Sequence, residues 1–181
     1  MVFLSLLVIC FFSKSLAFET KTSTGDKKHY IPELKPNLTV LVEALNTTER
    51  IWLKMMSYPK EYVTCLYIKK VRLTNDAYDF DEWYLKMEQK KKVPYSAKLS
   101  ESPDGPVMHV KHSGSKGGRP TPYVLKFWDK HETCGIFKLP SGCEQYVRES
   151  YAKKTVRACD KAYKRICGKM RFLIYKRTCK I

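Results

Sequence analysis

Cysteine is the residue type whose number and spacing say most about the chemistry of this chain. Of seven cysteines, Cys10 lies in an apolar N-terminal run, and the other six are dispersed: Cys65, Cys134, Cys143, Cys159, Cys167 and Cys179. Structural zinc sites usually contain closely spaced Cys-x-x-Cys pairs, and the sequence contains none. Six dispersed cysteines in an exported chain instead predict three disulfides.

Residues 1–17 are predicted to be a secretory signal peptide, which would remove Cys10 from the mature chain. The run at 2–12 is almost wholly apolar, but it is too short for a bilayer, which takes about 20 residues. Ser15-Leu16-Ala17 then supplies the small-x-small pattern of a cleavage site after Ala17. A membrane anchor is the alternative for this run. Because no later stretch approaches spanning length, we expect a secreted, soluble chain without a membrane span.

The charge of the chain restricts its partners. The sequence has 34 Lys and Arg against 18 Asp and Glu, a net charge of +16. It lacks the Arg/aromatic repeat of an RNA-binding sheet, so we expect no nucleic-acid partner. Sulfated glycans, anionic membranes or an acidic small ligand are the expected partners, and a solvated basic surface without a partner is the alternative. Sequons at Asn37 and Asn46 predict N-glycosylation.

Motifs for catalysis are missing from the sequence. It has no Gly-x-Ser-x-Gly, P-loop, Rossmann glycine run or His-Glu-x-x-His. His109 and His112 are three residues apart, so on a strand they face opposite sides and cannot share a metal. We therefore expect a binding protein rather than an enzyme, with no cofactor and no metal site.

The spacing of apolar and turn residues predicts an all-β domain. A polar arm at 18–37 precedes a short apolar segment, 38–45, that fits a turn or two of helix. β-rich segments follow, separated by turn residues such as Pro59, Asn75-Asp76 and Pro140-Ser141-Gly142. The predicted strands are 50–58, 62–73, 78–87, 95–99, 107–112, 123–128, 134–139 and 144–148. Eight strands without intervening helices predict an up-and-down barrel or a sandwich.

One segment, 155–167, has the periodicity of a helix instead. Its apolar residues share one helical face: Val156, Cys159, Ala162, Tyr163 and Ile166. Thr155 is suited to cap its start and Gly168 to end it, and a last short strand is expected at 171–175.

Helix geometry restricts how the cysteines pair. Cys159 and Cys167 would be about 12 Å apart on one helix, too far for a disulfide. Cys134 and Cys143 flank a turn asymmetrically, so they are not directly opposed. Both are therefore expected to reach the helix, which leaves Cys65 for Cys179.

Over residues 38–181 the layout resembles the tick salivary lipocalins, the group that includes the histamine-binding proteins. The segments that carry the resemblance are Thr64-Cys65, 133–137, 143–147, Cys159, Cys167-Gly168 and Cys179. The resemblance implies a lipocalin domain at 38–181, an eight-stranded antiparallel barrel with a helix packed outside it. It also implies the pairs Cys65–Cys179, Cys134–Cys159 and Cys143–Cys167, and sequestration of a small host mediator that suppresses inflammatory or immune defence.

Departures from the family pattern bear on the ligand. Amine-binding members carry Asp after the cysteine of the seventh strand, where this chain has Gly135, and Lys98 aligns with a histamine-binding Glu. The Glu-Leu-Trp motif of those members corresponds to Glu144-Gln145-Tyr146 here, so its glutamate is retained. Because a buried ammonium needs carboxylates, an apolar or anionic lipid such as a leukotriene or sterol is the predicted ligand. Histamine or serotonin is the alternative, and interaction with a host immune protein or cell surface is a third.

Aromatic residues expected to face the barrel interior are the candidates for the ligand site. In the segment 123–127, strand alternation places Tyr123, Leu125 and Phe127 on one face. A slip of one residue in the strand register would reverse such assignments. For each aromatic residue, ordinary core packing is the alternative to ligand binding. The predicted ligand-binding residues are Trp52, Tyr84, Tyr123, Phe127 and Tyr146, with Glu144 and Lys98 as polar anchors.

Overall fold

The computed structural model of the protein describes residues 35–115 and 117–180, so the predicted signal peptide and most of the predicted arm lie outside the described residues. In chain order the elements are α1 (Leu38–Leu45), β1 (Ile51–Met56), β2 (Val63–Leu73), β3 (Ala77–Lys86), β4 (Gln89–Ser100), β5 (Val107–His112), β6 (Thr121–Asp129), β7 (Cys134–Leu139), β8 (Gly142–Arg148), α2 (Glu149–Ala152), α3 (Arg157–Cys167) and β9 (Phe172–Leu173).

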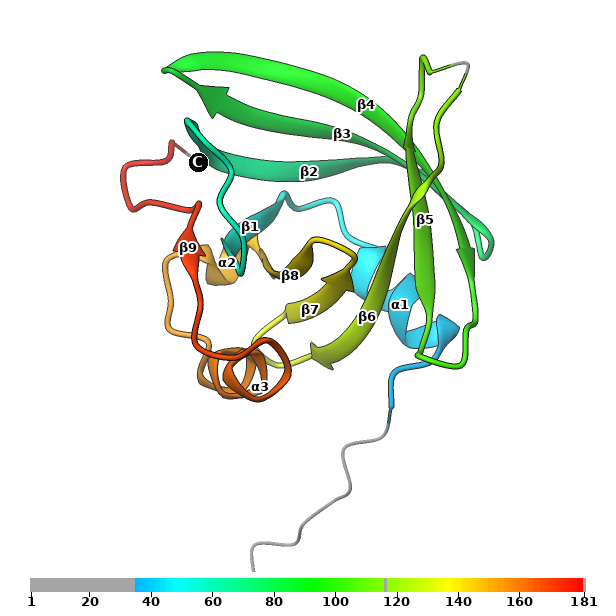
Figure 1. The fold of residues 1–181 in the computed structure, drawn as a ribbon. Helices are drawn as coiled ribbons and strands as arrows, with labels where there is room; N and C mark the ends of the chain where they lie inside the picture. Colours follow the sequence, from blue (N-terminus) through cyan, green and yellow to red (C-terminus); the bar gives the residue numbers. More distant parts are fainter. Residues whose placement is uncertain (1–34, 116, 181) are drawn as a thin grey trace, which may run out of the picture. The chain divides into compact units, whose positions relative to one another are not determined.

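Strands β1 to β8 form a closed antiparallel barrel (Figure 1). Each strand from β2 to β8 pairs with its neighbour in the chain, and β1 pairs with β8 on one side and with β2 on the other. The two-residue strand β9 pairs with Met55 and Met56, at the end of β1 that β2 does not reach. The eight-stranded barrel with a short N-terminal helix and a C-terminal helix is therefore confirmed.

Alternating connections divide the barrel into two ends. The β1–β2, β3–β4, β5–β6 and β7–β8 connections share one end, and α1 packs at the other. Asn37 Oδ1 accepts a hydrogen bond from Val40 N at 3.0 Å and caps α1. The Arg148 guanidinium donates to the carbonyl oxygens of Glu43 and Ala44 in the last turn, at 2.8 and 3.3 Å. These contacts hold the buried face of α1 across its end of the barrel, which is called the closed end below.

The two sequon asparagines lie at the two ends of α1, and both are exposed. Asn46 Oδ1 accepts a hydrogen bond from Lys70 Nζ at 2.8 Å. Glycosylation of Asn37 and Asn46 stays a prediction.

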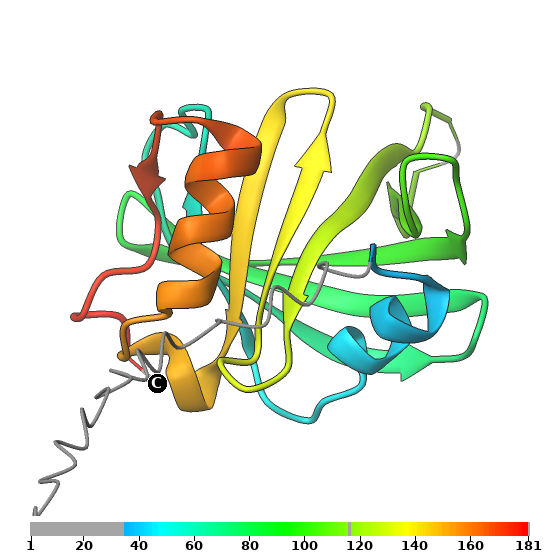
Figure 2. The same ribbon diagram turned by 90° about the horizontal axis from the view of Figure 1, so that it is seen from below.

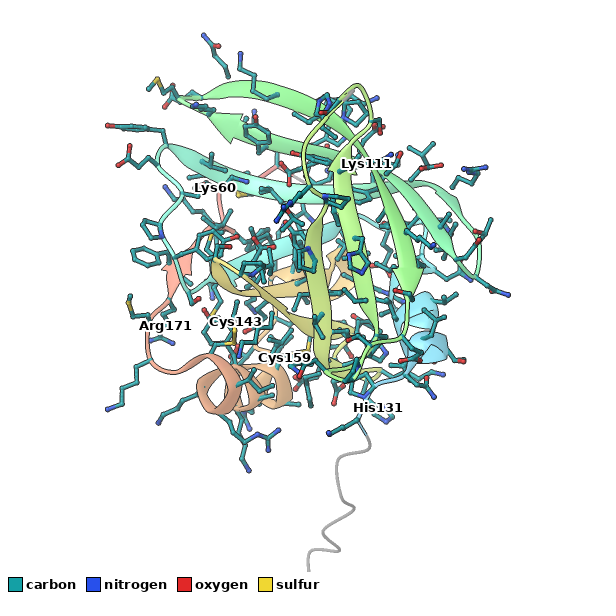
Figure 3. All side chains as sticks on the ribbon, turned by 45° about the vertical axis from the view of Figure 1, so that its right-hand side comes forward. Lys60, Lys111, His131, Cys143, Cys159 and Arg171 are labelled. Carbon is teal, nitrogen blue, oxygen red and sulfur yellow. A yellow bond between two sulfur atoms is a disulfide. The ribbon has the colours of Figure 1, made fainter. Side chains whose placement is uncertain are left out.

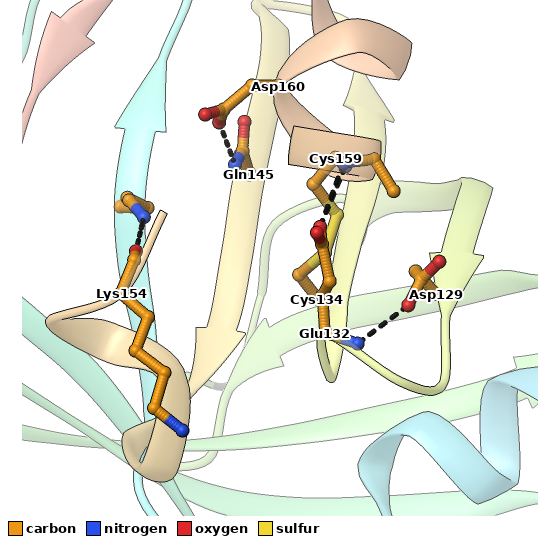
Figure 4. The surroundings of a disulfide bond; sticks show 9 residues. Asp129, Glu132, Cys134, Gln145, Lys154, Cys159 and Asp160 are labelled. Atoms are coloured by element: carbon orange, nitrogen blue, oxygen red, sulfur yellow. Dashed lines mark hydrogen bonds between the residues drawn. A yellow bond between two sulfur atoms is a disulfide. The ribbon is translucent and has the colours of Figure 1, made fainter. Parts of the chain in front are cut away.

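Helix α3 lies against the outside of β6, β7 and β8 (Figure 2). It begins at Arg157 rather than at Thr155, and its first turn is capped from another part of the chain. The Glu132 carboxylate accepts hydrogen bonds from Ala158 N at 2.9 Å and Cys159 N at 3.4 Å (Figure 4). Gly168 ends the helix with a φ of +81°. The short helix α2 was not predicted.

Three disulfides tie the outer elements to the barrel. They join Cys65 to Cys179, Cys134 to Cys159 and Cys143 to Cys167. The last two connect both strands of the β7–β8 hairpin to α3, and the first connects β2 to the C-terminal segment. The pairing implied by the family resemblance is therefore confirmed in all three cases.

The β3–β4 hairpin is longer than the sequence predicted. Strand β4 starts at Gln89 instead of Tyr95, directly after a two-residue turn in which Met87 and Glu88 both have positive φ, 48° and 65°. Residues 89–92 are all exposed. Because both faces of this hairpin tip meet solvent, it lacks the apolar alternation by which strands are recognised.

Among the described residues, no helix is both long and apolar enough to cross a membrane.

Capping of α3 by Glu132 can be tested directly. Glu132→Ala leaves two amide groups at the start of the helix without their acceptor, so the free energy of unfolding should fall by about 1 kcal/mol. Glu132→Gln keeps an acceptor and should cost less. Urea unfolding of both variants measures the difference. An unchanged free energy in Glu132→Ala would show that solvent satisfies the helix start equally well.

Candidate ligand-binding cavity

The barrel encloses a cavity of about 340 Å³. This volume is near the lower end of the roughly 300–1,000 Å³ typical of small-molecule sites. Ala44 and Leu45 of α1 line its closed end, while Lys60 and the β5–β6 connection, including Arg119, line its mouth. Figure 3 shows Lys60 and His131, which come from connections at the two ends of the barrel, on opposite sides of the molecule. The site is therefore a compact chamber that opens at one end.

A buried carboxylate, Glu144, lies beside the cavity wall. Its side chain is only 3% exposed. One carboxylate oxygen accepts a hydrogen bond from the Tyr58 hydroxyl, and the other accepts one from the Tyr146 hydroxyl at 2.7 Å. Burial raises the pKa of Glu144, and the two tyrosine hydrogen bonds and Lys60 offset part of that rise. Tyr146 lines the cavity, so Glu144 lies directly behind the surface that a ligand would touch.

A second carboxylate, Glu82 of β3, lines the same cavity. Burial raises its pKa, and the nearby charge of Glu144 adds to the rise. Lys60 lowers the pKa, but its Nζ lies 3.9 Å from Glu82 Oε1. Such a loose, partly exposed ion pair contributes little. Glu82 therefore lines the cavity and Glu144 lies just behind its wall, and Lys60 offsets the effect of burial on these two carboxyl groups only in part.

Aromatic rings form much of the remaining wall. The Phe80 and Tyr95 rings are stacked with centroids 5.5 Å apart, and Phe137 packs edge-on against Tyr146 at 5.8 Å and Tyr123 at 6.4 Å. Burial, followed by nearby acidic groups, raises the pKa of Tyr95 to about 12 and that of Tyr123 further. These hydroxyl groups therefore stay protonated, and a flat ligand would meet both aromatic faces and polar hydroxyls.

The closed end of the cavity explains why residue 135 is glycine. A Cβ atom there would lie 3.3 Å from Trp128 Cε3 and 3.3 Å from the Phe127 carbonyl oxygen. The indole of Trp128 therefore takes the space that an acidic side chain at this position would need. Trp128 and Thr133 line this end, and their Nε1 and Oγ1 atoms are buried without a hydrogen-bond partner in the described part of the chain.

Several residues predicted from the sequence lie at this site. Tyr123 and Tyr146 line the cavity, and Glu144 is bound to Tyr146. Tyr84 packs against the barrel core, half-buried, with Lys60 Nζ 5.8 Å from its ring centroid, but it does not line the cavity. Their roles in binding stay predictions.

The predicted interior positions of Trp52, Phe127 and Lys98 are wrong. Trp52 packs outside the barrel against Tyr67 and Tyr175, with ring centroids 4.8 and 5.2 Å away. Lys98 is exposed, since Ala97 and Leu99 on either side of it point into the core.

Phe127 is turned outwards by an irregularity in β6. The pairing of β6 with β7 shifts register between Leu125 and Phe127. Leu125 therefore lies in the barrel core with Tyr123, while Phe127 packs beneath α3. A β-bulge of this kind inserts one residue into a strand, which reverses the facing of every side chain beyond it.

Sequence reasoning missed Glu82, Tyr58, Tyr95 and Lys60. For Glu82 a signal was present, because Tyr78, Phe80 and Glu82 alternate along β3 and so share one face. Tyr78 and Phe80 both belong to the barrel core. Tyr58 and Lys60 lie in the β1–β2 connection, where no periodicity indicates which way a side chain points.

A closed eight-stranded antiparallel barrel with an internal cavity defines a lipocalin-type fold, and solved structures share it. A serotonin complex of AM182 matches with a TM-score of 0.62 at 16% identity, over 77% of this chain and 92% of that one. Japanin from Rhipicephalus appendiculatus, bound to cholesterol, matches with a TM-score of 0.53 at 16% identity, over 72% and 95%. No protein-family model and no curated protein matches the sequence. The chain thus shares the lipocalin-type fold of these two proteins.

The buried carboxylate should leave a signature in the pH dependence of stability. Folding raises the pKa of Glu144, so the folded protein binds more protons than the unfolded chain between the two pKa values. The free energy of unfolding contributed by this group therefore falls as the pH rises through that window, starting near the usual Glu pKa of about 4.3. Glu144→Gln should accordingly be more stable than the unaltered protein at pH 8 and closer to it at pH 4.5, measured by urea unfolding.

Glu149→Gln is the matched control, because Arg50 lowers the pKa of this carboxyl through a hydrogen bond. Its stabilisation is present above the usual Glu pKa and is lost as the pH falls through the lowered one. Glu149→Gln should therefore destabilise the protein at pH 8. A Glu144→Gln variant that is less stable than the unaltered protein at pH 8 would contradict the assignment.

Proposed function

We propose that this protein is a secreted binding protein that sequesters a small host mediator inside its barrel. The cavity with its buried carboxylates and aromatic walls supports this function more directly than catalysis, for which the sequence contains no motif. The three disulfides fit an extracellular location. Removal of such a mediator would blunt the host inflammatory or immune response.

Glu82 is the observation that favours a biogenic amine as the ligand. A protonated amine that leaves water for the cavity needs a carboxylate partner. Glu82 lines the cavity and, within the described part of the chain, has only the loose ion pair with Lys60, while Glu144 adds a second carboxyl group behind Tyr146. The sequence argument against an amine used Lys98, which lies outside the barrel, and Gly135, whose missing carboxylate Glu82 can replace.

The aromatic walls extend this argument to the rest of the ligand. A ring attached to the amine would pack between the Phe80–Tyr95 pair and the Phe137–Tyr123 pair, where aromatic contacts add to area burial. A hydroxyl group on that ring would lie at the closed end beside Trp128 and Thr133, whose Nε1 and Oγ1 atoms lack a partner in the described part of the chain. Serotonin carries an amine, a flat ring and a hydroxyl. AM182, which shares the fold, was crystallised as a serotonin complex.

An apolar or anionic lipid is the second candidate. Lys60, Lys111 and Arg119 line the mouth of the cavity, where they would attract a carboxylate head group. Aliphatic side chains further inside would surround the chain or ring system of a leukotriene or a sterol: Ile51, Ile68, Met108 and Val110. Japanin, with the same fold, was crystallised with cholesterol.

Calorimetric titration with serotonin, histamine, leukotriene B4 and cholesterol tests the two candidates against each other. We expect serotonin to bind, and Glu82→Gln to weaken it at least about tenfold because the ammonium loses its direct partner. Glu144→Gln should weaken it less, since this carboxylate acts from behind Tyr146. Glu149→Gln removes a charge outside the cavity and should bind normally. Binding of a lipid without any amine would select the second candidate, and binding of none of the four would refute both.

Amine binding should also release protons. The raised pKa values of Glu82 and Glu144 mean that the empty cavity retains protons to a higher pH than free carboxyls do. A bound ammonium favours the ionised form and lowers both pKa values, so binding expels protons and the affinity should fall as the pH drops from 7 to 5. Titrations in buffers of different ionisation enthalpy measure this release. A serotonin affinity that does not change over this range would contradict ion pairing with these carboxylates.

A further inference from the structure

Exposed apolar side chains gather at one end of the barrel. The described residues include six large apolar side chains that are exposed: Tyr62, Val71, Met87, Met170, Phe172 and Leu173. Three of them fall within residues 170–173, which include β9, and Phe172 of β9 pairs with Met56 just before the β1–β2 connection. Tyr62 and Met87 lie on the β1–β2 and β3–β4 connections, and Met87 N donates to Tyr62 O at 3.3 Å. All except Val71 therefore belong to the mouth end or to the segment 170–173, and we call these five the apolar rim.

The C-terminal part of the chain is strongly basic. Residues 153–180 contain seven lysines and four arginines against one acidic residue, Asp160. All eleven basic side chains are exposed. Asp160 Oδ1 accepts a hydrogen bond from Gln145 Nε2 at 2.9 Å, between α3 and the barrel. The outer surface of α3 and β9 is thus positive.

Three of these cations line a cleft between α3 and the segment that leads to β9, next in sequence to the rim residues Met170 and Phe172. The cleft has a volume of about 310 Å³ and is lined by Lys164, Lys169 and Arg171, with Tyr163 and Asp160 also in its wall. Figure 3 shows Arg171 at the segment that joins α3 to β9, on the outside of the barrel. Lys169 and Arg171 alternate in sequence with Met170 and Phe172, so cationic and apolar groups share one short exposed segment.

We propose that the apolar rim and this cleft dock the protein on an anionic phospholipid surface. Apolar side chains would enter the boundary between head groups and acyl chains, and Lys164, Lys169 and Arg171 would bind lipid phosphates. A sulfated glycan would use the cations but offers nothing to the exposed side chains of Phe172 and Leu173. A lipid surface uses both, and it would place the mouth of the cavity at the membrane.

Vesicle co-sedimentation tests this docking. The protein should bind vesicles of phosphatidylserine and phosphatidylcholine, bind phosphatidylcholine alone much more weakly, and dissociate as salt increases. Each basic residue near an anionic surface contributes about 1 kcal/mol. The double variant Lys169→Glu with Arg171→Glu should therefore bind at least about 30-fold more weakly. The double variant Lys35→Glu with Lys98→Glu changes the net charge equally, away from the cleft, and should retain most of the binding.

A second matched pair tests the apolar contact. Leu173 is 63% exposed and Val71 is 64% exposed, so neither serine substitution disturbs the core. Leu173→Ser should lower vesicle binding by about tenfold, because a leucine side chain is lost from the apolar layer, whereas Val71→Ser should leave it unchanged. Serotonin titration of each variant separates this surface from the cavity.

Three results would overturn the proposal. One is the absence of binding to phosphatidylserine vesicles by the unaltered protein. Another is an equal loss of binding in the two charge-reversed double variants, since general charge would then explain the attraction. The third is binding to heparin without binding to vesicles, which would assign the basic surface to sulfated glycans.

Discussion

The seam at which β1 closes the barrel is the constraint on which the rest of the structure depends. Direct pairing between β1 and β2 covers only two residue pairs, and β2 is irregular beside them, with a φ of +53° at Cys65 and a register shift against β3 between Thr64 and Tyr67. The C-terminal segment completes the seam. β9 pairs with the end of β1, the Cys65 amide donates to the Ile174 carbonyl at 2.9 Å, and Cys179 is bonded to Cys65. A barrel that would be weakly closed by its own strands is closed by the last residues of the chain.

Closure at this seam determines the electrostatics of the interior. A closed sheet has no free edges, so half of its side chains are removed from water whether they are apolar or not. For Glu82 and Glu144 the result is a raised pKa, with tyrosine hydroxyls and a loose ion pair to Lys60 as partial compensation. Natural cores seldom hold carboxylates without close cationic partners. A cationic ligand of the kind proposed above would supply the close cationic partner that the described part of the fold does not give these two carboxyl groups.

Much of the fold could be predicted from the sequence because cysteines and helical periodicity are unambiguous signals. The number of disulfides, the Cys65–Cys179 pair, and α3 to within two residues follow from them, whereas the partners of Cys134 and Cys143 on α3 followed only from the family resemblance. It was harder to predict which face of the sheet each side chain occupies. Both faces of β1 are buried, one in the barrel and one beneath the C-terminal segment, so the apolar character of Trp52 could not tell inside from outside. The bulge in β6 turned the Phe127 side chain outwards, and no residue type in this strand indicates a bulge. Glu82 was predictable from its alternation with Phe80.

The two sides of the barrel wall differ in the sign of their charged groups, and the net charge of the chain does not reveal this difference. The outer surface of α3 and β9 is cationic, whereas the interior contains carboxylates. Charge on the outside acts through water, where it is screened over about 8 Å at physiological ionic strength. Charge in the cavity acts at contact distance with little water between. In the proposed function, the net charge of +16 would govern which surfaces the protein approaches, while Glu82 and Glu144 would govern which ligand remains bound inside. Because the two act over different distances, a basic protein of this fold can attract anionic surfaces and still hold a cationic ligand.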